Sequence, residues 1–145
     1  MGNTKENIIE TARKLFGKYG FNKTSVDDIA HQSHIAKGTI YHYFKSKVDI
    51  LEEVISREEK LLREELKRNI DAVETPQDKL RAFVITRFNF IKNLSNYYDA
   101  LKEDYLTHHA FIEKVRKSDL EKDLNIVSQI LEEGINEAGS MASWI

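Results

Sequence analysis

The sequence predicts an all-α fold, and three kinds of observation support this prediction. Apolar residues recur with the helical period through most of the 145 residues, and no stretch alternates as a strand would. Capping residues and the single proline mark helix starts. With 41% hydrophobic and 32% charged residues, the chain has the composition of a folded helical protein that forms one or two small domains.

Three short helices are expected before residue 47. Their predicted ranges are 4–19, 25–32 and 36–43. Gly20 is placed to end the first helix, and Thr24 or Ser25 caps the second, with Asp27 or Asp28 as the partner in a capping box. Ser33 and His34 make the turn before the third helix. Two short helices across a tight turn are the layout of a helix-turn-helix motif.

Four further helices are expected in the rest of the chain. Ser46, followed by Asp49, caps a helix that reaches about residue 73. Thr75 and Pro76 start a helix to about residue 94, and its segment AFVITRFNFI is apolar almost all round, which predicts a central position. The last two predicted ranges run from Asn96 to about Leu106 and from His109 to Ala138.

Charge is distributed unevenly along the chain. Residues 1–47 hold eight Lys and Arg against four Asp and Glu, whereas residues 48–145 hold fourteen against twenty. A basic end on an acidic remainder suits a protein that presents one end to phosphates. The chain has no Cys, no signal-peptide pattern and no apolar run of transmembrane length, which indicates a cytoplasmic protein without disulfides.

The stretch from Ile35 to Lys47, IAKGTIYHYFKSK, is basic and aromatic and has no acid. With the preceding segments LFGKYGF and TSVDDIA and the continuation VDIL, it resembles the DNA-binding domain of TetR-family transcriptional regulators. This resemblance covers about a third of the chain. It implies a helix-turn-helix DNA-binding domain at residues 1–47 and a helical ligand-binding and dimerisation domain at residues 48–145.

The resemblance and the side-chain chemistry together predict the DNA contacts. A Lys at the start of the third helix reaches phosphate or a guanine edge, a Gly permits close backbone approach, and hydroxyl and imidazole groups bond phosphates or bases. The alternative is that Tyr41 packs in the core and the lysines are solvated surface. Ile40 and Phe44 are expected in the core. The predicted contacts are Thr24, Ser25, Lys37, Gly38, Thr39, Tyr41, His42, Tyr43 and Lys47.

Two positions depart from the family pattern. The family usually has Gly in the turn and Ser as the cap of the third helix, where this chain has His34 and Ala36. His tolerates left-handed backbone better than most side chains. Loss of a capping side chain costs about 1 kcal/mol of stability.

Aromatic residues are dense in the second half, and they either line an apolar cavity for an effector or pack as ordinary core. Arg87 lies near an apolar face, so it needs an anionic partner. That partner is expected to be an internal carboxylate, such as Asp99, Glu103 or Asp104, or the anionic head of a ligand. The predicted ligand-binding residues are Phe83, Arg87, Phe90, Tyr97, Tyr98 and Tyr105.

No pattern in the sequence predicts an enzyme. There is no nucleophile–base motif, glycine-rich phosphate loop or zinc-protease signature. His108 and His109 are adjacent, so on a helix they point about 100° apart and do not converge on a metal. Neither a metal nor a cofactor is therefore expected.

By resemblance, the chain is expected to be a homodimeric repressor that a small molecule releases from a palindromic operator, with half-sites about 34–36 Å apart. The alternative is a helical ligand-sensing or protein-interaction module that no longer binds DNA. Family members are generally longer, and this chain ends in GSMASWI soon after Ala138. The dimer-forming region is therefore expected to be shortened, or the final helix pairs on its own.

Overall fold

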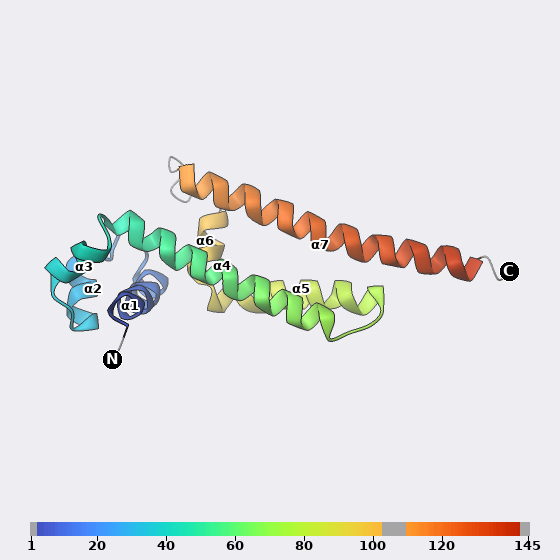
Figure 1. Ribbon diagram of the computed structural model, residues 1–145, viewed down its shortest axis with the longest axis horizontal. Coiled ribbons are helices and arrows are strands. Elements are labelled where there is room, and N and C mark those ends of the chain that lie inside the picture. The colour runs from blue at the N-terminus through green and yellow to red at the C-terminus, as the bar shows by residue number, and fades with distance from the viewer. Residues whose placement is uncertain (1–2, 103–109, 143–145) are drawn as a thin grey trace.

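The computed structural model describes residues 3–102 and 110–142, and of residues 140–142 it describes only the backbone. These residues form seven α-helices and no strand, which confirms the predicted all-α fold. Figure 1 shows an elongated molecule with α1–α3 at one end and the C-terminal half of α7 extending from the other. No helix in the described part of the chain is long and apolar enough to cross a membrane.

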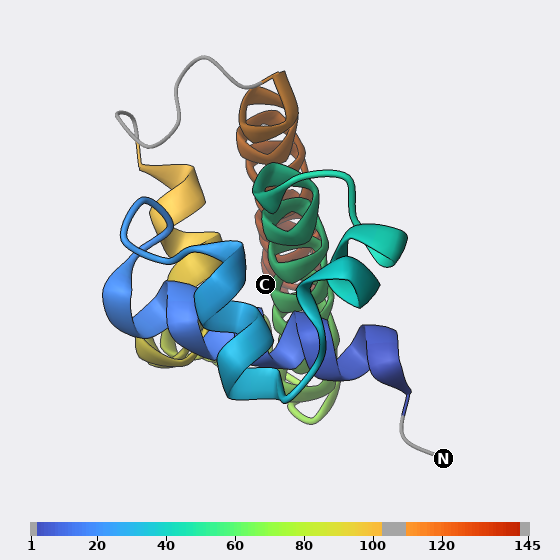
Figure 2. The same cartoon turned by 90° about the vertical axis from the view of Figure 1, so that its left-hand side faces the viewer.

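Three helices form the end of the molecule that we call the helix-turn-helix unit. They are α1 (Thr4–Tyr19), α2 (Val26–Ser33) and α3 (Lys37–Tyr43). Gly20 ends α1 with a φ of 89°, a backbone conformation that glycine adopts without steric cost. Figure 2 views this end along the long axis, with the unit in front of the start of the next helix.

The other four helices form the body. They are α4 (Lys47–Asp71), α5 (Pro76–Asn93), α6 (Ser95–Leu101) and α7 (Ala110–Ala142). The predicted caps hold two of the starts, because Ser46 Oγ accepts the Asp49 amide at 3.2 Å and Thr75 Oγ1 accepts the Asp78 amide at 3.1 Å. Both α4 and α5 therefore begin where the local sequence signals place them.

One hydrophobic cluster joins the unit to the body. It contains Ile8 and Ile40 from the unit, Leu51 and Leu62 from α4, and Ile112 from α7, all at most 1% exposed. Because α4 contributes to both ends of this cluster, the unit is packed firmly onto the body.

The predicted central position of α5 is wrong. Only Pro76 and Thr86 are buried on this helix, whereas Val84 and Phe88 are 56% and 72% exposed. α5 contacts α4, α6 and α7, and within the described residues nothing covers its remaining side. The apolar composition of AFVITRFNFI therefore reflects an open apolar face and not a helix enclosed on all sides.

The boundaries of α6 and α7 also differ from the prediction. α6 starts at Ser95 after Leu94, without a side-chain cap, so Asn96 lies inside the helix and is buried. α6 ends at Leu101 instead of about Leu106, and α7 continues to Ala142, beyond the predicted Ala138. The predicted residues Glu103, Asp104, Tyr105, His108 and His109 lie outside the described ranges.

Candidate nucleic-acid interface

Local hydrogen bonds fix the turn between α2 and α3. Ser25 and Asp28 form the predicted capping box, with Ser25 Oγ accepting the Asp28 amide at 3.0 Å and Asp28 accepting the Ser25 amide at 2.8 Å. These bonds lower the pKa of Asp28, because they stabilise its carboxylate form. His34 ends α2 in the left-handed conformation, with φ 58° and ψ 34°. The turn thus forms with His34 where the family usually has Gly.

Two apolar side chains attach α3 to the core. Ile40 is fully buried and the following Phe44 is 4% exposed, as predicted for both. The other six residues of α3 are exposed, including Tyr41 at 46% and Tyr43 at 43%. α3 begins after Ala36, which makes no side-chain cap. A short helix held by one internal residue therefore presents nearly its whole surface to solvent.

Lys37 lies at the first position of α3, and its ammonium group has a partner on α2. The Nζ atom is 3.0 Å from Asp27 Oδ1, and the Lys37 side chain is 51% exposed. The hydrogen bond to Asp27 raises the pKa of Lys37. An exposed ion pair of this kind contributes little stability, so a phosphate can replace Asp27 as the partner of Lys37.

Thr24 and Lys47 hold the loop before α2. Lys47 Nζ donates to the carbonyls of Phe21 at 2.8 Å and Thr24 at 3.0 Å, and it lies 4.2 Å from the centre of the Phe21 ring. Thr24 is 2% exposed, and its hydroxyl donates to the Gly20 carbonyl at 2.9 Å. Both side chains therefore make internal bonds that shape the surface beside α3.

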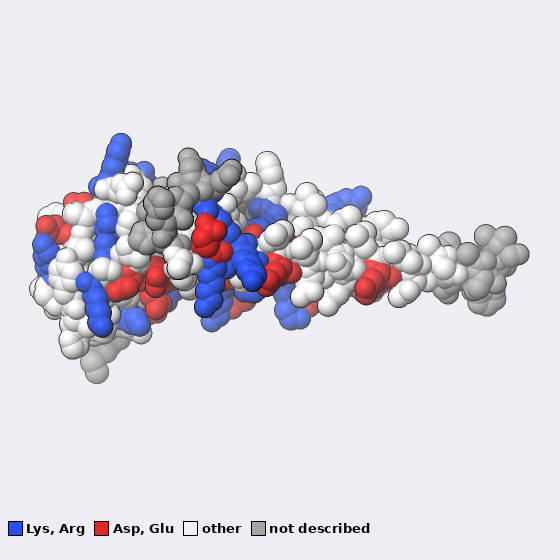
Figure 3. Space-filling model, turned by 90° about the horizontal axis from the view of Figure 1, so that it is seen from above, with Lys and Arg blue, Asp and Glu red and all other residues white. Residues whose placement is uncertain are grey.

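A shallow hollow brings several of the predicted contact residues together. Figure 3 shows Lys and Arg side chains, interspersed with acidic ones, on the end of the molecule that α1–α3 form. The hollow lies between the loop before α2 and the first turn of α3. Its lining includes Thr24, Ser25, Lys37, Tyr41 and Lys47, together with Asn22 and Lys23.

Gly38 has no structural reason to be glycine within the described residues. A Cβ built there meets no atom within 4 Å, and the residue lies in the first turn of α3. Glycine inside a helix costs about 1 kcal/mol relative to alanine. A residue that weakens the helix and fills no need of the fold is consistent with close approach of another molecule at this point.

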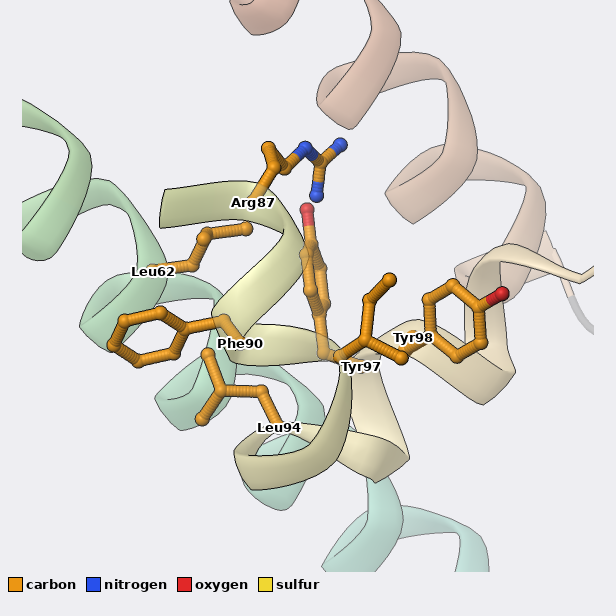
Figure 4. Close-up of a pocket in the computed structure, with 7 residues that line it drawn as sticks. Leu62, Arg87, Phe90, Leu94, Tyr97 and Tyr98 are labelled. Atoms are coloured by element: carbon orange, nitrogen blue, oxygen red, sulfur yellow. The ribbon is translucent and has the colours of Figure 1, made fainter. Parts of the chain in front are cut away.

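In the body, four of the predicted ligand-binding residues line one small pocket. Figure 4 shows Arg87, Phe90, Tyr97 and Tyr98 around it, with Leu62, Ile91 and Leu94 completing the lining. Phe83 does not line this pocket and packs against the core. Tyr105 lies outside the described residues.

Arg87 has the internal acidic partner that the sequence predicts, but the partner residues differ from those named. Its guanidinium is 2.5 Å from Asp119 and 2.6 Å from Asp123, both on α7. Arg63 of α4 approaches the same two carboxylates, each at 2.7 Å. We call Arg63, Arg87, Asp119 and Asp123 the four-charge cluster. Asp99 instead pairs with Lys102.

Sequence reasoning missed Asp119, Asp123 and a buried carboxylate on α4, Glu58. Asp119 and Asp123 are four residues apart, so they lie on one face of a helix. On α7 this face also carries Val115 and Ile130, both buried. Two acids on an otherwise apolar face were a signal in the sequence that could have pointed to these partners of Arg87. Among the described residues no group of His, Cys, Asp and Glu is arranged to hold a metal.

The fold and the exposed α3 define the class: a helix-turn-helix protein with a helical body. Residues 8–54 match the family model described as bacterial regulatory proteins, tetR family. This match assigns the helix-turn-helix unit to the TetR family, and over most of its length the chain is similar to the regulators described below.

The relatives are regulators of transcription and metabolism. The chain is 28% identical over 128 residues to the fatty acid metabolism regulator protein of Bacillus subtilis, a match that covers 88% of this chain and 66% of the relative. It is 27% identical over 122 residues to the HTH-type transcriptional regulator QacR of Staphylococcus aureus, covering 79% of this chain and 62% of QacR. The chain thus spans slightly less than two thirds of these curated relatives.

Solved structures share the fold over nearly the whole chain. A transcriptional regulator from Cytophaga hutchinsonii has a TM-score of 0.78 and 28% identity, over 92% of this chain and 67% of that one. FadR from Bacillus subtilis in complex with stearoyl-CoA has a TM-score of 0.69 and 27% identity, over 92% and 72%.

Proposed function

We propose that this protein is a cytoplasmic transcriptional repressor that binds a palindromic operator as a homodimer and leaves it when a small molecule binds the body. The observation that carries the proposal is α3, because six of its seven residues are exposed and none is acidic. A helix with this exposure, fixed to the core by Ile40 and the following Phe44, fits the major groove of a duplex. The function is one of binding, and no catalytic step is proposed.

We divide the predicted DNA contacts into two groups on the basis of their geometry. The exposed residues contact DNA directly, with Lys37 and Tyr41 at phosphates and the remaining members at bases or the sugar–phosphate chain. Thr24 and Lys47 act indirectly, since their polar atoms already bond the loop. The direct group is Ser25, Lys37, Gly38, Thr39, Tyr41, His42 and Tyr43.

Salt dependence of binding to a duplex tests the proposal. In a gel-shift titration with a random-sequence 30-base-pair duplex, the slope of log affinity against log salt should be negative, with a magnitude near 0.9 for each phosphate neutralised. Lys37→Ala should reduce both the affinity and this slope, whereas Lys92→Ala on α5, away from α3, should change neither. Affinity that stays flat between 50 and 200 mM salt would contradict DNA binding and support the protein-interaction alternative.

The dimer is supported by a second apolar face on α7. Leu120, Leu124, Leu131 and Ile135 are 60%, 56%, 52% and 70% exposed. At 100° per residue they fall within an arc of roughly 60°, about 130° around the helix from the residues that pack on the body. Figure 3 shows the C-terminal part of α7 as mostly uncharged surface. We assign this face, the α7 stripe, to a second copy of the chain.

The proposed function also sets the direction of this pairing. Figure 1 places the helix-turn-helix unit at one end of the molecule, while the C-terminal end of α7 points away from it. Two copies present both units to one duplex only when their long axes run in the same direction. The α7 helices therefore pair in parallel. With Val127 included, successive positions of the stripe are four, three, four and four residues apart, close to the spacing of a coiled-coil seam.

The pocket in Figure 4 is the proposed effector site. Its walls are apolar at Leu62, Phe90 and Leu94 and polar at Arg87 and Tyr97, and with a cavity volume of about 20 Å³ the pocket must widen to admit an apolar molecule with a polar group. The similar FadR structure holds stearoyl-CoA. Stearoyl-CoA should raise the melting temperature of this protein and coenzyme A alone should not; an equal response to both would contradict an apolar effector.

A further inference from the structure

We propose that Tyr97 couples the four-charge cluster of the body to the helix-turn-helix unit, because its amide bonds Glu58 and its hydroxyl bonds Asp119. This inference rests on the proposed function, because it assigns a route by which an event in the body changes DNA binding. The route consists of side chains and backbone groups that are joined by hydrogen bonds from α7 to α1.

Glu58 on α4 is the centre of the connection. Its side chain is 1% exposed, and its carboxylate accepts the Asn96 amide at 3.1 Å, the Tyr97 amide at 3.3 Å and the Asn96 side chain at 2.8 Å. Glu58 thereby satisfies the start of α6, which has no side-chain cap of its own. α6 thus depends on a carboxylate from another helix for its first hydrogen bonds.

On the side of the unit, Arg13 of α1 meets the same carboxylate. Arg13 Nε lies 3.4 Å from Glu58, and the Arg13 carbonyl accepts the Asn96 side chain at 3.0 Å. The two helices also approach closely, since a Cβ at Gly17 would lie only 3.1 Å from Ser95 Oγ. A movement of the first turn of α6 therefore acts directly on α1, which carries the core of the unit.

On the side of the body, Tyr97 reaches the four-charge cluster. Its ring is 2% exposed, and its hydroxyl donates to Asp119 at 2.5 Å. Burial, together with the neighbouring Asp119 carboxylate, raises the pKa of Tyr97, so the phenol stays a neutral donor. Asp119 in turn holds Arg63 and Arg87, and Arg87 lines the pocket.

Tyr97 therefore bonds both networks at once, through its amide to Glu58 and through its hydroxyl to Asp119. A molecule that draws Arg87 away from Asp119 would change the acceptor of the Tyr97 hydroxyl, and the rigid side chain transmits this to the start of α6. Contiguous hydrogen-bonded groups of this kind carry coupling energy between sites, and a direct measurement decides whether these do.

Hydrogen exchange of the whole chain without DNA or ligand provides that measurement. Tyr97→Phe removes one hydroxyl and keeps the ring. Amide exchange in α1 and in α2–α3 should rise at least threefold, although the altered atom faces α7. The matched controls are Tyr98→Phe, the adjacent and 40% exposed tyrosine, and Ile130→Val, a buried change on α7 outside the route. Amide exchange in Ile130→Val and in Tyr97→Phe is compared at temperatures that lie equally far below the melting temperature of each variant.

A double-mutant comparison tests whether the route passes through Glu58. In Glu58→Leu, which offers no acceptor to the Asn96 and Tyr97 amides, adding Tyr97→Phe should raise exchange in the unit by less than 1.5-fold, because the connection is already broken. Exchange in Tyr97→Phe equal to that in Ile130→Val, or independent effects of the two substitutions, would overturn the proposal. Because no DNA is present, a failure of DNA binding in the gel-shift assay leaves this result unaffected.

Discussion

The guanidinium of Arg87 on α5 and the carboxylate of Asp119 on α7 lie 2.5 Å apart. Asp119 bonds side chains from several helices of the body. It also accepts Arg63 from α4 and the hydroxyl of Tyr97 from α6. A single carboxylate, 10% exposed, thus contacts all three of the other body helices. Removing Asp119 would take an acceptor from the Tyr97 hydroxyl and leave both arginines with Asp123 alone, which is costly in a largely buried group.

Asp119→Ala should therefore destabilise the protein by about 3–5 kcal/mol, because Arg63, Arg87 and the Tyr97 hydroxyl lose an acceptor together. The matched control is Asp71→Ala, which removes an exposed pair with Lys67 and should cost less than about 1 kcal/mol. Equilibrium urea unfolding measures both changes. A loss in Asp119→Ala no larger than in Asp71→Ala would show that the cluster does not hold the body together.

Glu58 predicts a pH dependence of stability. Burial raises the pKa of its carboxyl above the ordinary value of 4.5, although bonds from Asn96 and Tyr97 and the charge of Arg13 oppose this. The folded state then binds more protons than the unfolded state above pH 4.5, so this contribution is present at low pH and is lost as pH rises through the folded-state pKa.

Glu58→Gln does not titrate, so its stability relative to the natural chain should increase as pH rises above 4.5. The change is about 1.4 kcal/mol for each pH unit within the window between the two pKa values. Urea unfolding of both proteins at several pH values from 4 to 8 measures the difference. A difference that is constant over this range, or that falls with rising pH, would contradict the raised pKa of Glu58.

Local signals in the sequence located most helix starts, because a cap depends on residues three positions apart. Ser25, Ser46 and Thr75 each accept the amide that the sequence predicts. The partner of Arg87 was beyond such reasoning, because Asp119 and Asp123 reach it only through the way α7 crosses α5. The burial of α5 was also mispredicted, since composition shows that a face is apolar but not whether another element covers it.

Gly38→Ala should separate stability from DNA binding. The added methyl group meets no described atom within 4 Å, so the substitution should stabilise the fold by about 0.5–1 kcal/mol. It should weaken DNA binding, because the methyl group blocks close approach of the sugar–phosphate chain. Gly139→Ala on α7, also with open space, should stabilise without changing affinity. Equal DNA affinity in Gly38→Ala and the natural chain would remove Gly38 from the contact surface.

Cysteine cross-linking can establish how two copies pair, because the natural chain contains no Cys. In the proposed parallel pair, each residue of the α7 stripe faces its own counterpart. Leu124→Cys and Leu131→Cys should therefore each form a disulfide-linked dimer alone under mild oxidation, as seen by non-reducing electrophoresis. Asn125→Cys, which is exposed but about 100° around the helix from Leu124, should cross-link much less.

An antiparallel pair gives the opposite pattern. The exposed positions of the stripe are spaced symmetrically about the midpoint of Val127 and Ser128, so Leu124 would face Leu131 of the partner. Each single variant would then stay monomeric under oxidation, and only a mixture of Leu124→Cys and Leu131→Cys would cross-link. That outcome would place the two helix-turn-helix units at opposite ends of the dimer and exclude simultaneous binding to adjacent half-sites. Absence of cross-links from all combinations would instead show that a second copy does not cover this face.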